Sequence, residues 1–241
     1  MSVPRPKSGY NGTSKRSWRY TINALFREHL GDVSSKNLLL FPQSNIEEIK
    51  AALEVGFKPG NIYAIDKSAQ VMSNLTMKLD RNGLPRVHTF GTYLSFATNR
   101  DLKNEYSQKQ IPSGSIDAAN LDFNGWISHD FSGEVWRFAT SGVLRPISIV
   151  SITFFEGREQ RETRDKLEKL GFSSHAKESF AHLGVQPITR GRLYYIQDLL
   201  GGKLVHGQCT NEVALLDTGS YLSPEGGRFR WAMFILEKLN G

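Results

Sequence analysis

Residues 37–66, NLLLFPQSNIEEIKAALEVGFKPGNIYAID, constrain the fold more than any other part of the chain. The apolar run at residues 38–41 is typical of a buried strand, and the pattern of residues 46–55 predicts an amphipathic helix. A second apolar run at residues 61–66 follows, and it closes on an acid. Strand, helix and strand in this order predict a βαβ unit and therefore a parallel sheet.

The acid that closes this unit is Asp66. A carboxylate at the tip of the second strand of a βαβ unit accepts hydrogen bonds from a ribose diol. We therefore expect a cofactor that contains adenosine. The alternative is a structural role, in which Asp66 caps a helix that begins near Ser68.

Length and charge suggest one large domain with a small basic appendage. The 241 residues divide into a basic N-terminal arm and helix at 1–36 and a domain at 37–241. Lys and Arg outnumber Asp and Glu by 30 to 24, which gives a net charge of +6. This excess favours an anionic partner, nucleic acid first, although a merely basic protein has the same composition.

Other classes of protein are disfavoured by what the sequence contains. Cys209 is the only cysteine, so no disulfide forms within the chain, and the scattered histidines predict no metal site. The apolar runs are too short for a membrane span of about 18 residues. We therefore expect a cytoplasmic protein that does not bind membranes.

Beyond residue 66 the alternation of strands and helices continues and then changes. Strands are predicted at 85–89, 115–123 and 146–155, and helices at 68–82, 126–141 and 159–170. Three later runs, 192–197, 203–206 and 229–238, are predicted as strands between Gly-rich turns. The prediction is an α/β fold with a doubly wound, mostly parallel sheet and an antiparallel C-terminal edge.

Four segments follow the predicted strands on the side where open α/β sheets bind ligands. They are FPQSN at 41–45, Asp66, HTFGT at 88–92 and NLDFNG at 120–125. In this order residues 37–240 resemble the class I S-adenosylmethionine-dependent methyltransferases, whose fold is a seven-stranded Rossmann-like sheet. The resemblance implies S-adenosylmethionine as the cofactor. The chain departs from the family at 41–45, where it has no glycine.

The resemblance implies roles for individual residues. Asp66 would hold the ribose, and Thr89, with Thr92 as the other choice, would meet the adenine. The loop after the first strand would meet the methionine portion of the cofactor, through Pro42, Gln43, Ser44 and Asn45. An ordinary turn with Ser44 or Asn45 as the helix cap is the structural alternative.

The segment after the fourth strand is the candidate catalytic site. Asn120, Asp122 and Phe123 stand where amino-methylating members of the family carry a polar residue and an aromatic one. Asp122 would accept a hydrogen bond from a substrate amine, and Phe123 would stack on a base. A capped turn at Gly125 is the alternative.

Basic residues next to aromatic ones suggest where nucleic acid would bind. The N-terminal group contains Tyr10, Lys15, Arg16, Trp18, Arg19 and Tyr20. A second group contains Arg190, Arg192, Lys203, His206, Arg228 and Arg230, and Arg158 is a further phosphate candidate. These side chains also have a bland interpretation, as core aromatics and ordinary ion pairs.

Three functions are compatible with these features. The first is methyl transfer to a nucleic acid. The second is a non-catalytic module of the same fold that binds nucleic acid or a protein partner in a larger assembly. The third is a Rossmann enzyme that uses another nucleotide or consumes S-adenosylmethionine in a different reaction. The missing GxGxxG motif disfavours NAD.

Overall fold

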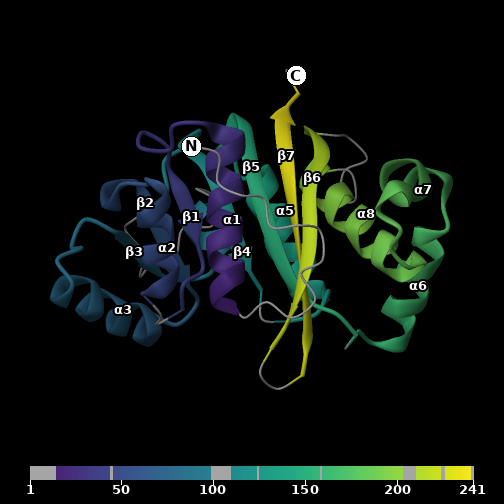
Figure 1. The fold of residues 1–241 in the computed structure, drawn as a ribbon, viewed down its shortest axis with the longest axis horizontal. Coiled ribbons are helices and arrows are strands. Elements are labelled where there is room, and N and C mark those ends of the chain that lie inside the picture. Colours follow the sequence, from purple (N-terminus) through teal and green to yellow (C-terminus); the bar gives the residue numbers. More distant parts are fainter. Residues whose placement is uncertain are drawn as a thin grey trace.

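Seven strands form one continuous sheet in the computed structural model (Figure 1), which describes residues 15–43, 46–98, 110–123, 125–157, 159–202, 210–223 and 226–239. The sheet order is β3-β2-β1-β4-β5-β7-β6. The strands are β1 (Leu38–Leu40), β2 (Ile62–Asp66), β3 (His88–Gly91), β4 (Ile116–Asp122), β5 (Leu144–Phe155), β6 (Asn211–Leu222) and β7 (Arg228–Lys238).

The strand directions confirm the predicted fold class. Strands β3, β2, β1, β4 and β5 are parallel neighbours. β7 is antiparallel to β5, and β6 is antiparallel to β7, so the C-terminal hairpin closes one edge of the sheet. The sheet reverses direction of winding at β1 and β4, which is where such folds bind ligands.

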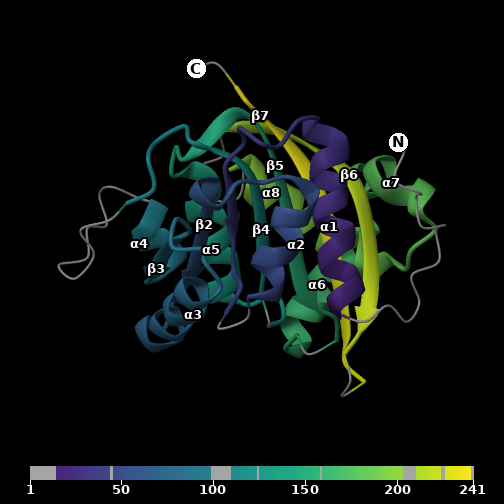
Figure 2. The same cartoon turned by 60° about the vertical axis from the view of Figure 1, so that its left-hand side comes forward.

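Helices cover both faces of the sheet (Figure 1, Figure 2). One face packs against α1, α2 and α3, and the other packs against α4, α5 and α8. The helices are α1 (Lys15–Leu30), α2 (Glu47–Val55), α3 (Ala69–Arg81), α4 (Leu94–Thr98), α5 (His129–Thr140), α6 (Arg161–Gly171), α7 (Ser174–Phe180) and α8 (Pro187–Gly201), with short 3-10 turns at η1 (Pro59–Asn61) and η2 (Ala181–Leu183). Within these described residues, no helix is both long and apolar enough to cross a membrane.

Helix α1 packs onto the sheet through an apolar stripe. Trp18, Ile22 and Phe26 are buried, at the spacing of one helix face. The Trp18 ring lies 5.5 Å from the ring of Tyr221 in the edge strand β6. α1 therefore shares a core with α2 and α3, and this packing places its first turn close to the ends of the central strands.

Local signals in the sequence explain where the helices next to the site begin and end. Ser68 caps α3 by accepting a hydrogen bond from the Val71 N–H, and Ser128 caps α5 in the same way through Phe131. Gly56 ends α2 in a left-handed conformation with a φ of 116°. These caps fix the points at which the loops after β2 and β4 turn back over the sheet.

Two predictions of secondary structure were wrong. The third strand begins at His88 and not at residue 85, because Leu84 bonds back to Leu79 and closes the end of α3. Residues 192–197, predicted as a strand, belong to α8. Their aromatic and β-branched composition favours a strand, but Leu193, Ile196 and Leu200 are buried at helical spacing.

The C-terminal third contains more helix than expected. Along the chain, α6, α7 and α8 all come between β5 and β6. The long strand β6 was not predicted. α6 and α8 cross at Gly171 and Gly191, where an added Cβ would collide with the backbone of the facing helix. The strand predicted at 203–206 lies outside the described residues.

Candidate functional site

A cavity of about 860 Å³ opens beyond the carboxyl ends of β1, β2 and β4. Its wall combines the loops that follow these strands and β3 with the first turns of α4 and α5. Five of the residues given a cofactor or catalytic role from the sequence lie on this wall: Gln43, Asp66, Thr92, Asp122 and Phe123. The size is typical of a pocket for a small molecule or cofactor.

The loop after β1 approaches the cavity through Gln43. Gln43 has a φ of 54°, which is uncommon for a residue with a side chain and recurs at functional turns. Pro42 is buried behind it and is not on the wall. Ser44 and Asn45 lie outside the described residues, so their predicted roles stay predictions.

Asp66 stands on the cavity wall at the last position of β2. Its Oδ1 accepts a hydrogen bond from the Ser68 N–H at 2.8 Å, which fixes the orientation of the carboxylate. The helix cap itself is Ser68, so Asp66 is not needed for that role. A carboxylate oriented in this way at the end of the second strand is suited to a ribose diol.

At the end of β3 the cavity meets Thr92, not Thr89. Thr89 lies within the strand, and its hydroxyl is 3.1 Å from the hydroxyl of Thr76 in α3. It is not one of the residues that line the cavity, so its position does not fit the predicted adenine contact. Thr92 does line the cavity, and its buried Oγ1 has no hydrogen-bond partner among the described residues.

The end of β4 contributes a buried acid. Asp122 is 4% exposed, and its Oδ2 lies 2.8 Å from the Lys15 ammonium at the start of α1. Its Oδ1 has no hydrogen-bond partner in the part of the chain that the structure describes. A buried carboxylate with an unused oxygen at a cavity wall is a candidate acceptor for a ligand N–H.

Asn120, the third predicted catalytic residue, is not on the cavity wall. It is buried two positions before Asp122 on the same face of β4, and its Nδ2 donates to Glu48 Oε1 at 2.7 Å. A direct contact between Asn120 and a substrate does not fit this position. Asn120 is therefore placed to act on the site through its neighbours Glu48 and Asp122.

Glu48 is an acid that the sequence analysis did not select. Burial raises its pKa to about 8, and the negative charge of Asp122 adds to this effect. Arg19 and Lys15 oppose the shift, as does the hydrogen bond from Asn120. Glu48 therefore retains its proton to a higher pH than an exposed glutamate does. The sequence signal was ambiguous, since an acid in the first turn of α2 is also typical of an exposed helix start.

Aromatic rings form one side of the cavity. Phe123 packs edge-on against Phe41 and Phe131, with ring centroids 5.4 and 4.8 Å apart. Its ring is therefore engaged by two neighbours. Tyr93 and Trp126, which sequence analysis did not select, line the same cavity and are 51% and 40% exposed. Large exposed rings at a cavity mouth are typical of sites that bind planar ligands.

The second basic group is largely engaged within the protein. Arg192 is buried, and its guanidinium donates to both carboxylate oxygens of Glu159 at 2.8 and 2.9 Å. Arg230 donates to Glu156 at 2.7 Å, and Arg190 donates to two backbone carbonyl oxygens. These three side chains are therefore poor candidates for phosphate contacts. Lys203, His206 and Arg158 lie outside the described residues.

The N-terminal group is divided between core and site. Trp18 is buried, so its ring does not face solvent as a stacking residue would. Lys15 is paired with Asp122. Residues 1–14, which include Tyr10, lie outside the described residues, so the nucleic-acid contact of the arm stays a prediction.

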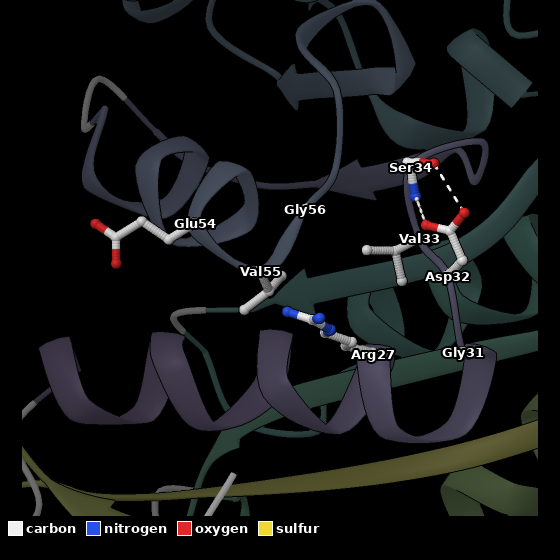
Figure 3. A pocket seen from close by; sticks show the side chains of 8 residues that line it. All are labelled: Arg27, Gly31, Asp32, Val33, Ser34, Glu54, Val55 and Gly56. Atoms are coloured by element: carbon white, nitrogen blue, oxygen red, sulfur yellow. Dashed lines mark hydrogen bonds between the residues drawn. The ribbon is translucent and has the colours of Figure 1, made fainter. Parts of the chain in front are cut away.

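A second hollow of about 530 Å³ lies where α1 and α2 end (Figure 3). Its acids already have partners: both oxygens of Asp32 accept from Ser34 at 2.9 and 3.0 Å, and Glu54 accepts from Tyr20 at 3.2 Å. Arg27 extends across the hollow toward α2 in Figure 3. This hollow is also at the edge where β1 and β2 begin, away from the ligand side of such sheets.

The fold is that of the class I S-adenosylmethionine-dependent methyltransferases. TYW2 from Pyrococcus horikoshii, solved with MeSAdo, matches with a TM-score of 0.55 at 11% identity, over 98% of this chain and 70% of its own. A proposed sarcosine dimethylglycine methyltransferase from Galdieria sulphuraria matches with a TM-score of 0.54 at 12% identity, over 92% of this chain and 85% of its own.

The same fold also supports another reaction. The [4+2]-cyclase SpnF matches with a TM-score of 0.54 at 12% identity, over 92% of this chain and 81% of its own. Two longer matched chains are covered over only 64% and 53% of their length. No protein-family model matches the chain, and no curated protein sequence matches it at a significant level. At these identities the likeness establishes the fold, and function has to be argued from the site.

Proposed function

We propose that this chain is an S-adenosylmethionine-dependent methyltransferase that acts on an amine of a nucleic-acid base. The observation that carries the proposal is the position of Asp66 and Asp122 on the wall of one cavity, at the ends of β2 and β4, the two parallel strands that flank β1. One acid is suited to the cofactor, and the other to the methyl acceptor. The fold favours the same assignment.

The residues present fit the cofactor. Asp66 has the position and chemistry of a ribose ligand, and the partnerless hydroxyl of Thr92 is a donor or acceptor for the adenosine portion. Gln43 brings an amide and a left-handed backbone to the side where the methionine portion would lie. Bound S-adenosylmethionine would supply a sulfonium methyl group.

The protein's own contribution is alignment. Asp122 accepts a hydrogen bond from the acceptor amine and holds its nitrogen in line with the methyl group. Phe123, held between Phe41 and Phe131, forms a rigid apolar wall behind the reacting atoms. Tyr93 and Trp126 supply exposed ring faces on which a base stacks.

Nucleic acid is proposed as the acceptor because of charge. The chain has a net charge of +6, and residues 1–16 are rich in Lys and Arg without any acid. Basic segments of this kind neutralise phosphates and release counterions on binding. The engaged arginines of the C-terminal group make the N-terminal segment the leading candidate for these contacts.

Transfer of tritiated methyl groups tests the proposal. The purified protein is incubated with methyl-labelled S-adenosylmethionine and, separately, total RNA, genomic DNA or a protein extract. We expect label in nucleic acid that nuclease releases, lost in Asp122→Ala and retained in Asp165→Ala, a control acid exposed on α6. Label that protease alone releases would contradict the nucleic-acid substrate, and label undiminished in Asp122→Ala would contradict the role of Asp122.

A non-catalytic module is the second candidate. Two observations favour it: the loop at 41–45 contains no glycine, and Lys15 already occupies one oxygen of Asp122. A protein that binds RNA in a salt-dependent manner, yet binds no S-adenosylmethionine at millimolar concentration, would establish this candidate in place of the first.

A further inference from the structure

Four polar side chains form a row next to the cavity: Lys15 in the first turn of α1, which is partly exposed, and the buried Glu48, Asn120 and Asp122. Asn120 and Asp122 point to the same face of β4, because they are two residues apart in one strand. Lys15 of α1 reaches Asp122, and Glu48 of α2 reaches Asn120. Three elements that are distant in sequence therefore converge behind a single carboxylate of the site.

The contacts in this row are short and specific. The Lys15 ammonium lies 2.8 Å from Asp122 Oδ2, and the Asp122 side chain is only 1% exposed. Asn120 Nδ2 donates to Glu48 Oε1 at 2.7 Å, which fixes the orientation of the amide. An ion pair with one partner this deeply buried is much less screened than one at the surface.

The row contains two acids, and their ionisation is coupled by charge. The groups that face Glu48 are Asp122 on β4, Lys15 and Arg19 on α1 and Tyr221 on β6. Burial and the charge of Asp122 both raise the pKa of Glu48. Two negative charges close together in a buried site repel each other, so the arrangement is more stable when one of two neighbouring acids is neutral.

We propose that Lys15 and Glu48 are positioning residues for Asp122. The Lys15 ammonium pairs with Asp122 and ties its Oδ2 to α1, which leaves Oδ1 for the ligand. Glu48 stays protonated, fixes Asn120 beside it and adds no second negative charge. The positioning role rests on the proposed function, because it acts through Asp122. The protonated state of Glu48 does not depend on the proposed function.

The stability of the folded protein tests the protonated state of Glu48 without any substrate. A carboxyl group whose pKa is raised on folding retains a proton that the unfolded chain releases. The contribution of Glu48 to the free energy of unfolding therefore falls as pH rises from about 4.5, the ordinary pKa, to about 8. Above that pH this contribution does not change further. Glu48→Gln keeps the shape and the acceptor oxygen but does not titrate.

The experiment compares thermal unfolding midpoints of wild type, Glu48→Gln and Glu47→Gln between pH 5 and 9. Glu47, the preceding residue, is a matched control because it is more exposed and pairs with Lys50 at 3.1 Å. We expect Glu48→Gln to gain stability relative to wild type progressively up to about pH 8, and Glu47→Gln to parallel wild type. A constant difference between Glu48→Gln and wild type would overturn the proposal for Glu48.

Methyl transfer tests the functional part, with total RNA and labelled S-adenosylmethionine as the probe. Wild-type turnover should decline above about pH 8, where Glu48 ionises, and Glu48→Gln should keep its plateau. Lys15→Met should lower turnover by about 10- to 100-fold and leave the KM for S-adenosylmethionine unchanged, with Lys50→Met as a control. Unchanged turnover in Lys15→Met would overturn the proposal for Lys15.

The two experiments separate failure of this inference from failure of the proposed function. Absence of cofactor binding and of transfer in the wild type would refute the proposed function and, with it, the positioning role. The unfolding experiment would still decide whether Glu48 is protonated. Normal transfer in the wild type with the same pH profile in Glu48→Gln would refute the positioning role of Glu48 alone.

Discussion

The two ends of strand β4 each carry a buried aspartate, and the two are used differently. At the first end, Asp117 accepts the Asn37 N–H at 2.9 Å and lies 3.2 Å from Arg145 and 3.5 Å from Lys36. Both of its oxygens are engaged. At the other end, Asp122 Oδ2 pairs with Lys15, and its Oδ1 has no hydrogen-bond partner among the described residues.

This difference separates a structural acid from a functional one. Asp117 joins the start of β4 to the segment before β1 and to the start of β5, which holds three chain segments together. Asp122 is equally buried, but its hydrogen-bonding capacity is incomplete and it faces a cavity. A buried oxygen without a partner is costly unless a ligand or water satisfies it, so we propose that the incomplete end is the end that binds.

The largest expected effect is on methyl transfer, which should depend on the aspartate at the end of β4 and not on the one at its start. Asp122→Asn is expected to reduce methyl transfer by about 10²- to 10⁴-fold, because an amide neither carries the charge nor accepts at both positions. The measurement is label transfer per folded molecule, with circular dichroism to confirm the fold. Asp117→Asn should keep its activity per folded molecule. Equal losses in the two variants would break the comparison.

Asp66, at the end of β2 on the other side of β1, extends the comparison to the cofactor. Asp66→Ala is expected to weaken binding of S-adenosylhomocysteine by about 10- to 100-fold, since it removes charge-assisted hydrogen bonds to the ribose. Calorimetric titration measures the loss. Asp80→Ala, an exposed acid on α3, is the control. An unchanged affinity in Asp66→Ala would place the ribose elsewhere.

The structural end should show its effect in stability. Asp117→Asn is expected to lower the free energy of unfolding by about 1–3 kcal/mol, because Lys36 and Arg145 lose their buried anion while remaining accessible to water. Urea denaturation measures this change. Asp122→Asn should cost less, since one of its two oxygens has no hydrogen-bond partner to lose among the described residues. The reverse order of the two losses would contradict the assignment of roles.

The smallest expected effect is on stability and comes from Lys36, one of the partners of Asp117. Lys36→Gln is expected to change the free energy of unfolding by less than about 1 kcal/mol, because Arg145 and the Asn37 N–H still satisfy the carboxylate. The same urea titration measures it. A loss as large as that of Asp117→Asn would mean that Lys36 alone stabilises the buried charge.

The sequence predicted the parts of the site that depend on local order along the chain. Residues 37–66 carry buried apolar runs and a helix with a clear end at Gly56, so the unit and the position of Asp66 followed directly. The position of Asp122 followed from the same rule at β4. The absence of glycine from the loop at 41–45 was also visible in the sequence, although two of its five residues lie outside the described residues.

What could not be predicted depends on contacts between distant segments. Glu48 and Lys15 have the pattern of exposed charges at helix starts, and only the packing of α1 and α2 on the sheet brings them close to Asn120 and Asp122. Thr89 was chosen over Thr92 because the start of β3 was placed three residues early. Arg192 was assigned to a strand surface, whereas α8 buries it against Glu159.

Calorimetric titration of the wild-type protein with S-adenosylmethionine and S-adenosylhomocysteine is the most direct test of the central claim, that the cavity at the ends of β1, β2 and β4 is a cofactor site. The account predicts saturable binding of one equivalent with micromolar affinity. Absence of binding at millimolar ligand would contradict it, and the incomplete end of β4 would then need another ligand.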